Sequence, residues 1–244
     1  MLRIIPNKIH ITRPFRLPLI RPFHIDNSCV LCLLPEIGSK WLDCSRYRNN
    51  GTISGAILKQ GRYGAALQFD GVNDYVNCGN DASLAPEKLT IEFWMYPKVV
   101  NASKYIICKA TDTGYARDYT LILESNGEMN FWFGENSNSY VSLNSSAISA
   151  NQWIHIVALR DGSNARFYLN GVEDTSKAYS FTPTDKGHTL KLGDLNAIAA
   201  NYFNGIFDEV RIYNRALSAE EVRGNMFTSK RYRYMRGIQK CGVR

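Results

Sequence analysis

The chain has 244 residues, of which 45% are hydrophobic and 21% are charged. This composition is typical of a globular protein, and the length is sufficient to bury a core without disulfides or metals. No stretch approaches the ~18 apolar residues of a bilayer-spanning helix, which excludes a transmembrane helix. The formal charge of +7 is unevenly distributed: residues 1–28 carry a net +4, residues 229–244 carry +6 and the intervening body carries −3. The sequence therefore indicates a mildly acidic body between two basic ends.

The first 28 residues alternate basic and apolar side chains and contain Pro6, Pro14, Pro18 and Pro22. Proline fixes φ and removes a backbone donor, so we expect an extended arm here. The prolines also interrupt every candidate apolar core of a signal peptide. We therefore expect synthesis in the cytoplasm, a reducing compartment in which the six cysteines remain thiols.

Cys29 and Cys32 have the spacing of a metal-binding CxxC pair, but no second Cys/His pair stands at finger spacing. Cys32 lies in an apolar run, where cysteine usually acts as a small hydrophobic residue. The pattern favours packed thiols over a zinc site.

From Cys29 onward, apolar residues recur with a period of two, which is typical of strands with one buried face. Turn pairs separate these segments, and Asn170-Gly171 is a strong hairpin signal. Many short strands with polar turns predict an all-β sandwich. The clearest strand patterns cover residues 89–96, 119–124, 128–133, 153–160, 165–169, 189–192 and 207–213.

One helix is predicted near the C-terminus. Ser218 and Glu221 have the spacing of a capping box, and Gly224 is expected to weaken the helix soon afterwards. No internal repeat or second core is visible. We therefore predict a single domain over residues 29–228, preceded by the arm at 1–28 and followed by a basic tail at 229–244.

Several stretches, in the same order along the chain, resemble the laminin-G-like (concanavalin A-like lectin/glucanase) family of jelly-roll domains. The resemblance implies a sandwich of two antiparallel sheets. One loop departs from the family pattern, because Arg46, Tyr47 and Arg48 replace its usual small residues. The matching stretches are DCSRYRNNGT (43–52), GRYGAALQFDGVNDYV (61–76), LTIEFW (89–94), QWIHIV (152–157), FYLNG (167–171) and GIFDEVRIYNRALS (205–218).

The resemblance also implies a structural Ca²⁺ between the loop after the first strand and the last strand. The matched positions are Asp43, Asn50 and Asp208, with a backbone carbonyl near Thr52. Carboxylate, amide and carbonyl oxygens are the ligands that Ca²⁺ prefers. The alternative is that Asp43 and Asn50 close turns while Asp208 caps a strand edge.

No catalytic pattern is visible, and we expect no enzyme activity. Glucanases on this fold cluster acids on one strand, whereas Glu92 stands alone on its strand face and Asp208-Glu209 is expected to point to opposite faces. His155 lies in a strand, where a packed or partly exposed histidine is expected rather than a general base. A glycoside hydrolase is a remote alternative.

Three partner classes follow from these features. The basic ends are predicted to dock onto other protein subunits through residues 1–28 and 229–244, or to contact nucleic acid through their cations and tyrosines. Glycan binding is expected from the family, with Tyr47, Tyr115, Tyr140 and Tyr202 as candidate rim aromatics. We favour a non-catalytic structural component of a large assembly, such as a virion or phage particle, over the alternative of a lectin-like carbohydrate-binding module.

Overall fold

The computed structural model describes residues 26–35, 40–111, 116–195 and 201–235, with the side chains of 34, 35 and 228–235 left out. Residues 1–25 of the predicted basic arm (1–28) and residues 236–244 of the predicted basic tail (229–244) lie outside these residues. The elements in chain order are β1 Cys29–Pro35, β2 Lys40–Asp43, β3 Gly51–Ser54, β4 Ile57–Gly61, β5 Gly64–Asp70, β6 Tyr75–Asn77, η1 Ala82–Leu84, β7 Leu89–Pro97, β8 Lys104–Lys109, β9 Arg117–Leu123, β10 Met129–Asn136, β11 Ser139–Asn144, β12 Ile154–Arg160, β13 Asn164–Leu169, β14 Val172–Ala178, β15 Leu190–Leu192, β16 Asn204–Tyr213 and α1 Ala219–Met235.

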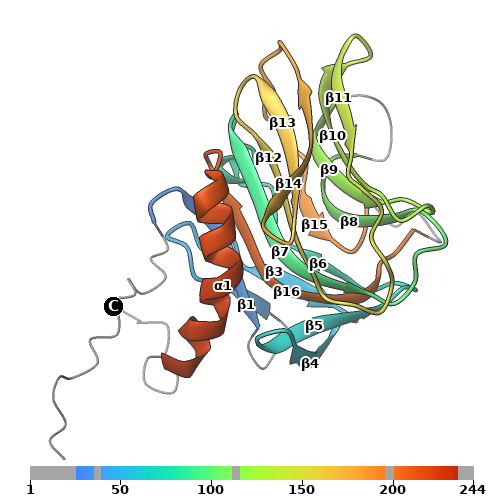
Figure 1. The fold of residues 1–244 in the computed structure, drawn as a ribbon, viewed down its shortest axis with the longest axis vertical. Helices are drawn as coiled ribbons and strands as arrows, with labels where there is room; N and C mark the ends of the chain where they lie inside the picture. Colours follow the sequence, from blue (N-terminus) through green and yellow to red (C-terminus); the bar gives the residue numbers. More distant parts are fainter. Residues whose placement is uncertain (1–25, 36–39, 112–115, 196–200, 236–244) are drawn as a thin grey trace, which may run out of the picture.

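The strands form two antiparallel layers (Figure 1). Sheet A has the order β14-β13-β12-β7-β16, and the far edge of β16 pairs with β5 near one end and with β1 near the other. Sheet B has the order β11-β10-β9-β8-β15-β6-β3-β2-β1. Strand β1 belongs to both sheets and joins them. The predicted all-β sandwich is confirmed.

The core lies between the sheets, where the inward residues of alternating strands meet. Phe207 of β16 packs edge-on against Phe93 of β7, with ring centroids 5.9 Å apart, and stacks on Phe203 at 4.4 Å. On the sheet B side, Phe131 and Phe133 enter the same core from β10. These side chains are fully buried, so this face of each sheet provides most of the hydrophobic stabilisation.

Helix α1 packs on the outer face of sheet A, beside β1 and β16 and away from β8–β11 (Figure 1). Its predicted capping box is present: Glu221 N–H donates to Ser218 Oγ at 3.2 Å, and Ser218 N–H donates to Glu221 Oε2 at 2.8 Å. The helix continues past Gly224 to Met235, into the segment predicted as a tail. Among the described residues, no helix is long and apolar enough to cross a membrane.

Candidate functional site

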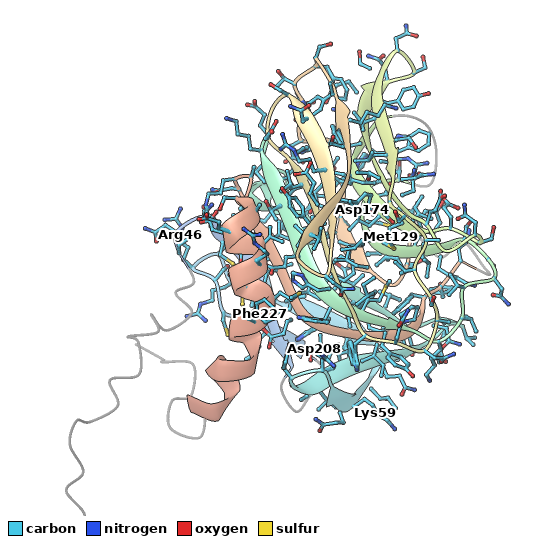
Figure 2. The ribbon with its side chains drawn as sticks, viewed as in Figure 1. Arg46, Lys59, Met129, Asp174, Asp208 and Phe227 are labelled. Carbon is cyan, nitrogen blue, oxygen red and sulfur yellow. The ribbon has the colours of Figure 1, made fainter. Side chains whose placement is uncertain are left out.

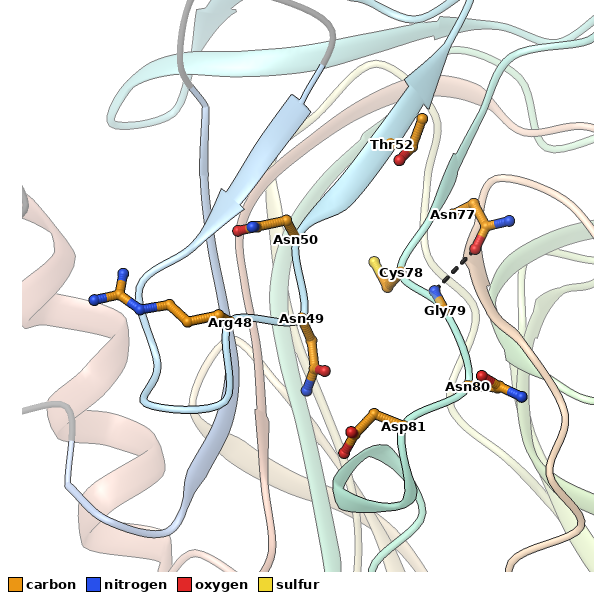
Figure 3. A pocket seen from close by; sticks show the side chains of 9 residues that line it. All are labelled: Arg48, Asn49, Asn50, Thr52, Asn77, Cys78, Gly79, Asn80 and Asp81. Atoms are coloured by element: carbon orange, nitrogen blue, oxygen red, sulfur yellow. Dashed lines mark hydrogen bonds between the residues drawn. The ribbon is translucent and has the colours of Figure 1, made fainter.

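A polar pocket lies between two loop segments at one side of sheet B, and we call it the loop pocket. One wall is formed by residues 48–52 and the other by residues 77–81, and they enclose about 490 Å³. Figure 3 shows Asn49 and Cys78 directed between the two walls, whereas the Arg48 side chain points away from them. Asn77 Oδ1 accepts a 2.8 Å hydrogen bond from Gly79 N–H and fixes the turn of the second wall.

The first wall is organised by the buried carboxylate of Asp43. Its Oδ1 accepts 2.8 Å hydrogen bonds from the backbone N–H groups of Cys32 and Ser45. Its Oδ2 accepts from the Ser45 hydroxyl and the Asn49 N–H, each at 2.7 Å. A carboxylate with protein donors on both oxygens holds a loop without needing a bound ion.

The structure places the residues predicted to bind calcium in two locations. Asn50 Oδ1 accepts a 2.9 Å hydrogen bond from Asp43 N–H, so these two residues are adjacent. Asp208 lies on β16, where its Oδ2 accepts a 2.8 Å hydrogen bond from Tyr63 N–H in the turn between β4 and β5. Within the described part of the chain, no group of three acidic, histidine or cysteine side chains is arranged to hold a metal. Calcium binding by Asp43, Asn50 and Asp208 stays a prediction, and the hydrogen bonds made by Asp43 weigh against it.

A second polar surface lies on the outer side of β9, β10 and β11, and we call it the aromatic face. It comprises Arg117, Asn130, Trp132, Tyr140 and Ser142. Gly134 pairs with Arg117 on one side and Tyr140 on the other, and it has no side chain to fill the space between them. The Trp132 ring lies between Tyr140 and Arg117. It stacks on Tyr140 with ring centroids 5.2 Å apart, and the Arg117 guanidinium lies 4.9 Å from the Trp132 ring centroid.

The amide of Asn130 lies beside this stack. Its Nδ2 donates to Ser142 Oγ at 2.7 Å and to Asn144 Oδ1, which orients the amide. The carbonyl oxygen Oδ1 is buried and has no hydrogen-bond partner among the described residues. An acceptor left in this state costs about 1–3 kcal/mol.

The candidate rim tyrosines have different environments. Tyr140 is 41% exposed and belongs to the aromatic face. Tyr47 packs against the core, Tyr202 is buried, and Tyr115 lies outside the described residues. Sequence reasoning missed Trp132, although the strand pattern over residues 128–133 already set it on the face opposite Phe131.

Glu92 and His155, considered above as possible catalytic groups, form a buried pair beneath α1. Glu92 Oε1 lies 3.0 Å from His155 Nε2 and 3.8 Å from the Arg211 guanidinium, while Glu92 Oε2 accepts a 2.9 Å hydrogen bond from Asn225 of α1. Burial raises the pKa of Glu92, but the His155 hydrogen bond and the charge of Arg211 outweigh burial and hold it below the usual value. These partners of Glu92 come from β12, β16 and α1, and none of them is an acid on its own strand. Their burial gives the network a structural role.

Comparisons with known proteins agree with this architecture. The chain superposes with a TM-score of 0.69 on the binding domain of Paraclostridial Mosquitocidal Protein 1, at 18% identity, covering 82% of this chain and 52% of that one. For the binding domain of botulinum neurotoxin DC in complex with rat synaptotagmin II, the TM-score is 0.61 at 18% identity, with 83% and 52% covered. This chain thus spans about half the length of these toxin domains.

Domain 4 of AbnA, a GH43 extracellular arabinanase from Geobacillus stearothermophilus solved with arabinotriose, gives a TM-score of 0.59 at 20% identity, covering 71% of this chain and 86% of that one. No curated protein sequence matches the chain. The laminin-G family model matches residues 70–223, well over half of the sequence. The chain therefore belongs to the concanavalin A-like lectin/glucanases superfamily.

Proposed function

We propose that this chain is a non-catalytic, lectin-like carbohydrate-binding module, and that its aromatic face contacts the glycan. The observation that carries the proposal is the stacked arrangement of Arg117, Trp132 and Tyr140. The exposed ring of Tyr140, which is backed by Trp132, offers apolar surface to the C–H face of a sugar.

Asn130 holds its amide in a fixed orientation beside the stacked rings. Because Ser142 and Asn144 hold its NH₂ group, the carbonyl oxygen is presented in one orientation. Arg117 adds a cation at the same surface.

The solved neighbours support the choice of ligand class. The AbnA domain was solved with arabinotriose, and this chain covers most of that domain's length. The toxin neighbours are binding domains, one of them solved with the protein receptor synaptotagmin II. Arabino-oligosaccharides are therefore the first probes, followed by a broad glycan array.

The test compares the full chain with two aromatic variants. Trp132→Ala should raise the Kd for the best array ligand roughly tenfold or more, as expected for a central aromatic contact. Phe227→Ala is the matched control, because Phe227 is 62% exposed on α1, well separated from β10 in Figure 2. The proposal fails if no glycan binds the wild-type chain, or if both variants lose affinity equally.

A second proposal concerns where such a module works. We propose that the chain is a component of a large assembly such as a virion or phage particle, and the net charges of +4 and +6 on its two ends support docking to other subunits. Deleting residues 1–25 should leave the melting temperature unchanged and abolish higher oligomers in sedimentation experiments. An unchanged oligomer distribution would contradict the docking role of this segment.

A further inference from the structure

The CxxC motif of β1 belongs to a cluster of three thiols on the outer face of sheet A. Cys29 and Cys32 are both buried in the same hydrophobic cluster, and half-buried Cys44 packs against it. Leu217 and Val222, which lie just before and within α1, belong to the same cluster. The described cysteines form no disulfide, and Cys241 lies outside the described residues.

A β-bulge brings Cys29 and Cys32 to one face. In a regular strand, residues three apart point to opposite sides. Here the pairing of β1 with β16 shifts between Cys29 and Leu31, and both intervening residues, Val30 and Leu31, enter the core between the sheets. The two cysteines therefore share the outer face.

Cys44 reaches this face from the neighbouring strand. Leu33 pairs with Asp43 in the antiparallel register of β1 and β2, so Cys44 lies opposite Cys32. The 2.9 Å hydrogen bond from Cys44 N–H to the Cys32 carbonyl continues this pairing by one residue. Cys44 is the most exposed of the three, which makes it the thiol that an oxidant reaches first.

The backbone decides which two sulfur atoms can bond. A disulfide needs Cα atoms about 4.4–6.8 Å apart. Cys29 and Cys32 pair with Tyr213 and Arg211, which are two strand residues apart, so at roughly 3.3 Å per residue their Cα atoms lie about 6.6 Å apart, at the upper limit of this range. Directly opposite antiparallel residues have Cα atoms about 5.5 Å apart, within the range of a disulfide. We propose that Cys32 and Cys44 form a reversible cross-strand disulfide, and that the sequence-adjacent Cys29 does not take part in the bond.

The chemistry requires a small-molecule disulfide such as oxidised glutathione. The Cys44 thiolate attacks it, forms a mixed disulfide and releases one glutathione thiol. Cys32 then attacks the Cys44 sulfur and releases the second glutathione thiol, and the protons of the two protein thiols end on the two glutathione molecules. A hydrogen bond with Cys29, together with burial, raises the pKa of Cys32 well above its usual value, so the second step is the slow one.

The bond would connect the end of β2 to β1 at the start of the loop that forms the first wall of the loop pocket. Asp43 and Ser45, which organise that loop, flank Cys44 on both sides. Oxidation would therefore fix the base of this wall.

Peptide mapping tests the proposal on the full chain carrying Cys241→Ser. The protein is incubated with oxidised glutathione, alkylated and digested with trypsin without reduction. Cleavage after Lys40 and Arg46 releases Cys44 on peptide 41–46, separate from the peptide that holds both Cys29 and Cys32. A Cys32–Cys44 bond therefore joins two peptides, whereas a Cys29–Cys32 bond stays within one.

We expect the joined peptides in the parent protein and in Cys29→Ser, and their loss in Cys32→Ser and Cys44→Ser. Cys78→Ser and Cys108→Ser are matched controls, because each removes a buried thiol outside the cluster and should leave the joined peptides unchanged. Because the parent protein reports the bond without any substitution in the cluster, misfolding of a variant does not obscure the result. A disulfide confined to the single peptide, or thiols that persist in the native chain while the urea-unfolded chain oxidises, would overturn the proposal.

Discussion

Replacing Asp43 with asparagine tests whether its hydrogen bonds hold the first wall of the loop pocket. Asparagine keeps one oxygen for the N–H groups of Cys32 and Ser45. It places an NH₂ group where Oδ2 accepts from the Ser45 hydroxyl and the Asn49 N–H. Two hydrogen bonds to an ionised group, at about 1.5–3 kcal/mol each, are lost. Rotation of the Ser45 hydroxyl to accept from the new amide recovers part of this, which leaves a loss of about 3–4 kcal/mol in the free energy of unfolding.

Urea unfolding followed by tryptophan fluorescence measures this loss. With a denaturant slope of about 2 kcal/mol/M, the midpoint should fall by about 1.5–2 M. Asp70→Asn is the matched control, because exposed Asp70 accepts a 2.8 Å hydrogen bond from Val72 N–H, and its midpoint should move by less than about 0.5 M. Equal shifts for the two variants would refute the organising role of Asp43.

The same pair of variants bears on the calcium prediction. If protein donors alone hold Asp43, its loss of stability is the same in EDTA and in excess Ca²⁺. A loss that appears only when Ca²⁺ is present would instead support calcium binding at Asp43 and Asn50.

Other expected outcomes concern the sheets and the helix. Because the pKa of Glu92 is lowered from its usual 4.5 in the folded chain, its charge stabilises the fold above pH ~4.5. That stability is lost as pH falls through the folded pKa; Glu92→Gln should flatten this part of a urea midpoint series between pH 7 and 3, and an unchanged slope would exclude Glu92 as its source. Ser218→Ala should cost about 1 kcal/mol in thermal unfolding by removing the α1 cap, and no change would mean the cap is dispensable. Gly193→Ala should cost about 1–3 kcal/mol more than Gly187→Ala in urea unfolding. Both positions have positive φ, but only at Gly193 would a Cβ fall within 2.8 Å of Phe69, and equal losses would mean the ring moves aside.

The sequence predicted those turns and helix caps that depend only on residues close together in the chain. The Asn170-Gly171 turn joins β13 and β14 with φ values of 52° and 79°, which match the hairpin expected from this pair. The capping box at Ser218 formed as predicted because its two hydrogen bonds lie within four residues. Alternation predicted β7, β10, β12 and β16, and also the short β15, but β3 and β6, with four and three residues, contain too few alternations to identify.

Features that depend on pairing between distant strands were not predictable. Regular alternation in β16 sets Asp208 and Glu209 on opposite faces. In the structure Phe207 and Val210 both enter the core, and the residues between them lie at a bulge where Glu209 has φ +55° and forms an ion pair with Arg211. The position of Trp132 over Gly134 likewise depends on the cross-strand neighbours of that glycine, which single-strand periodicity does not specify.

Tryptophan side-chain NMR tests whether the aromatic face binds the glycan. The chain has four tryptophans, and each gives its own indole N–H signal. On titration with the best-binding glycan, we expect a saturable shift of the Trp132 signal. The signal of Trp41, which is fully buried in the core, should stay in place. Saturable glycan binding that leaves the Trp132 signal unmoved would show that the glycan does not bind at the aromatic face.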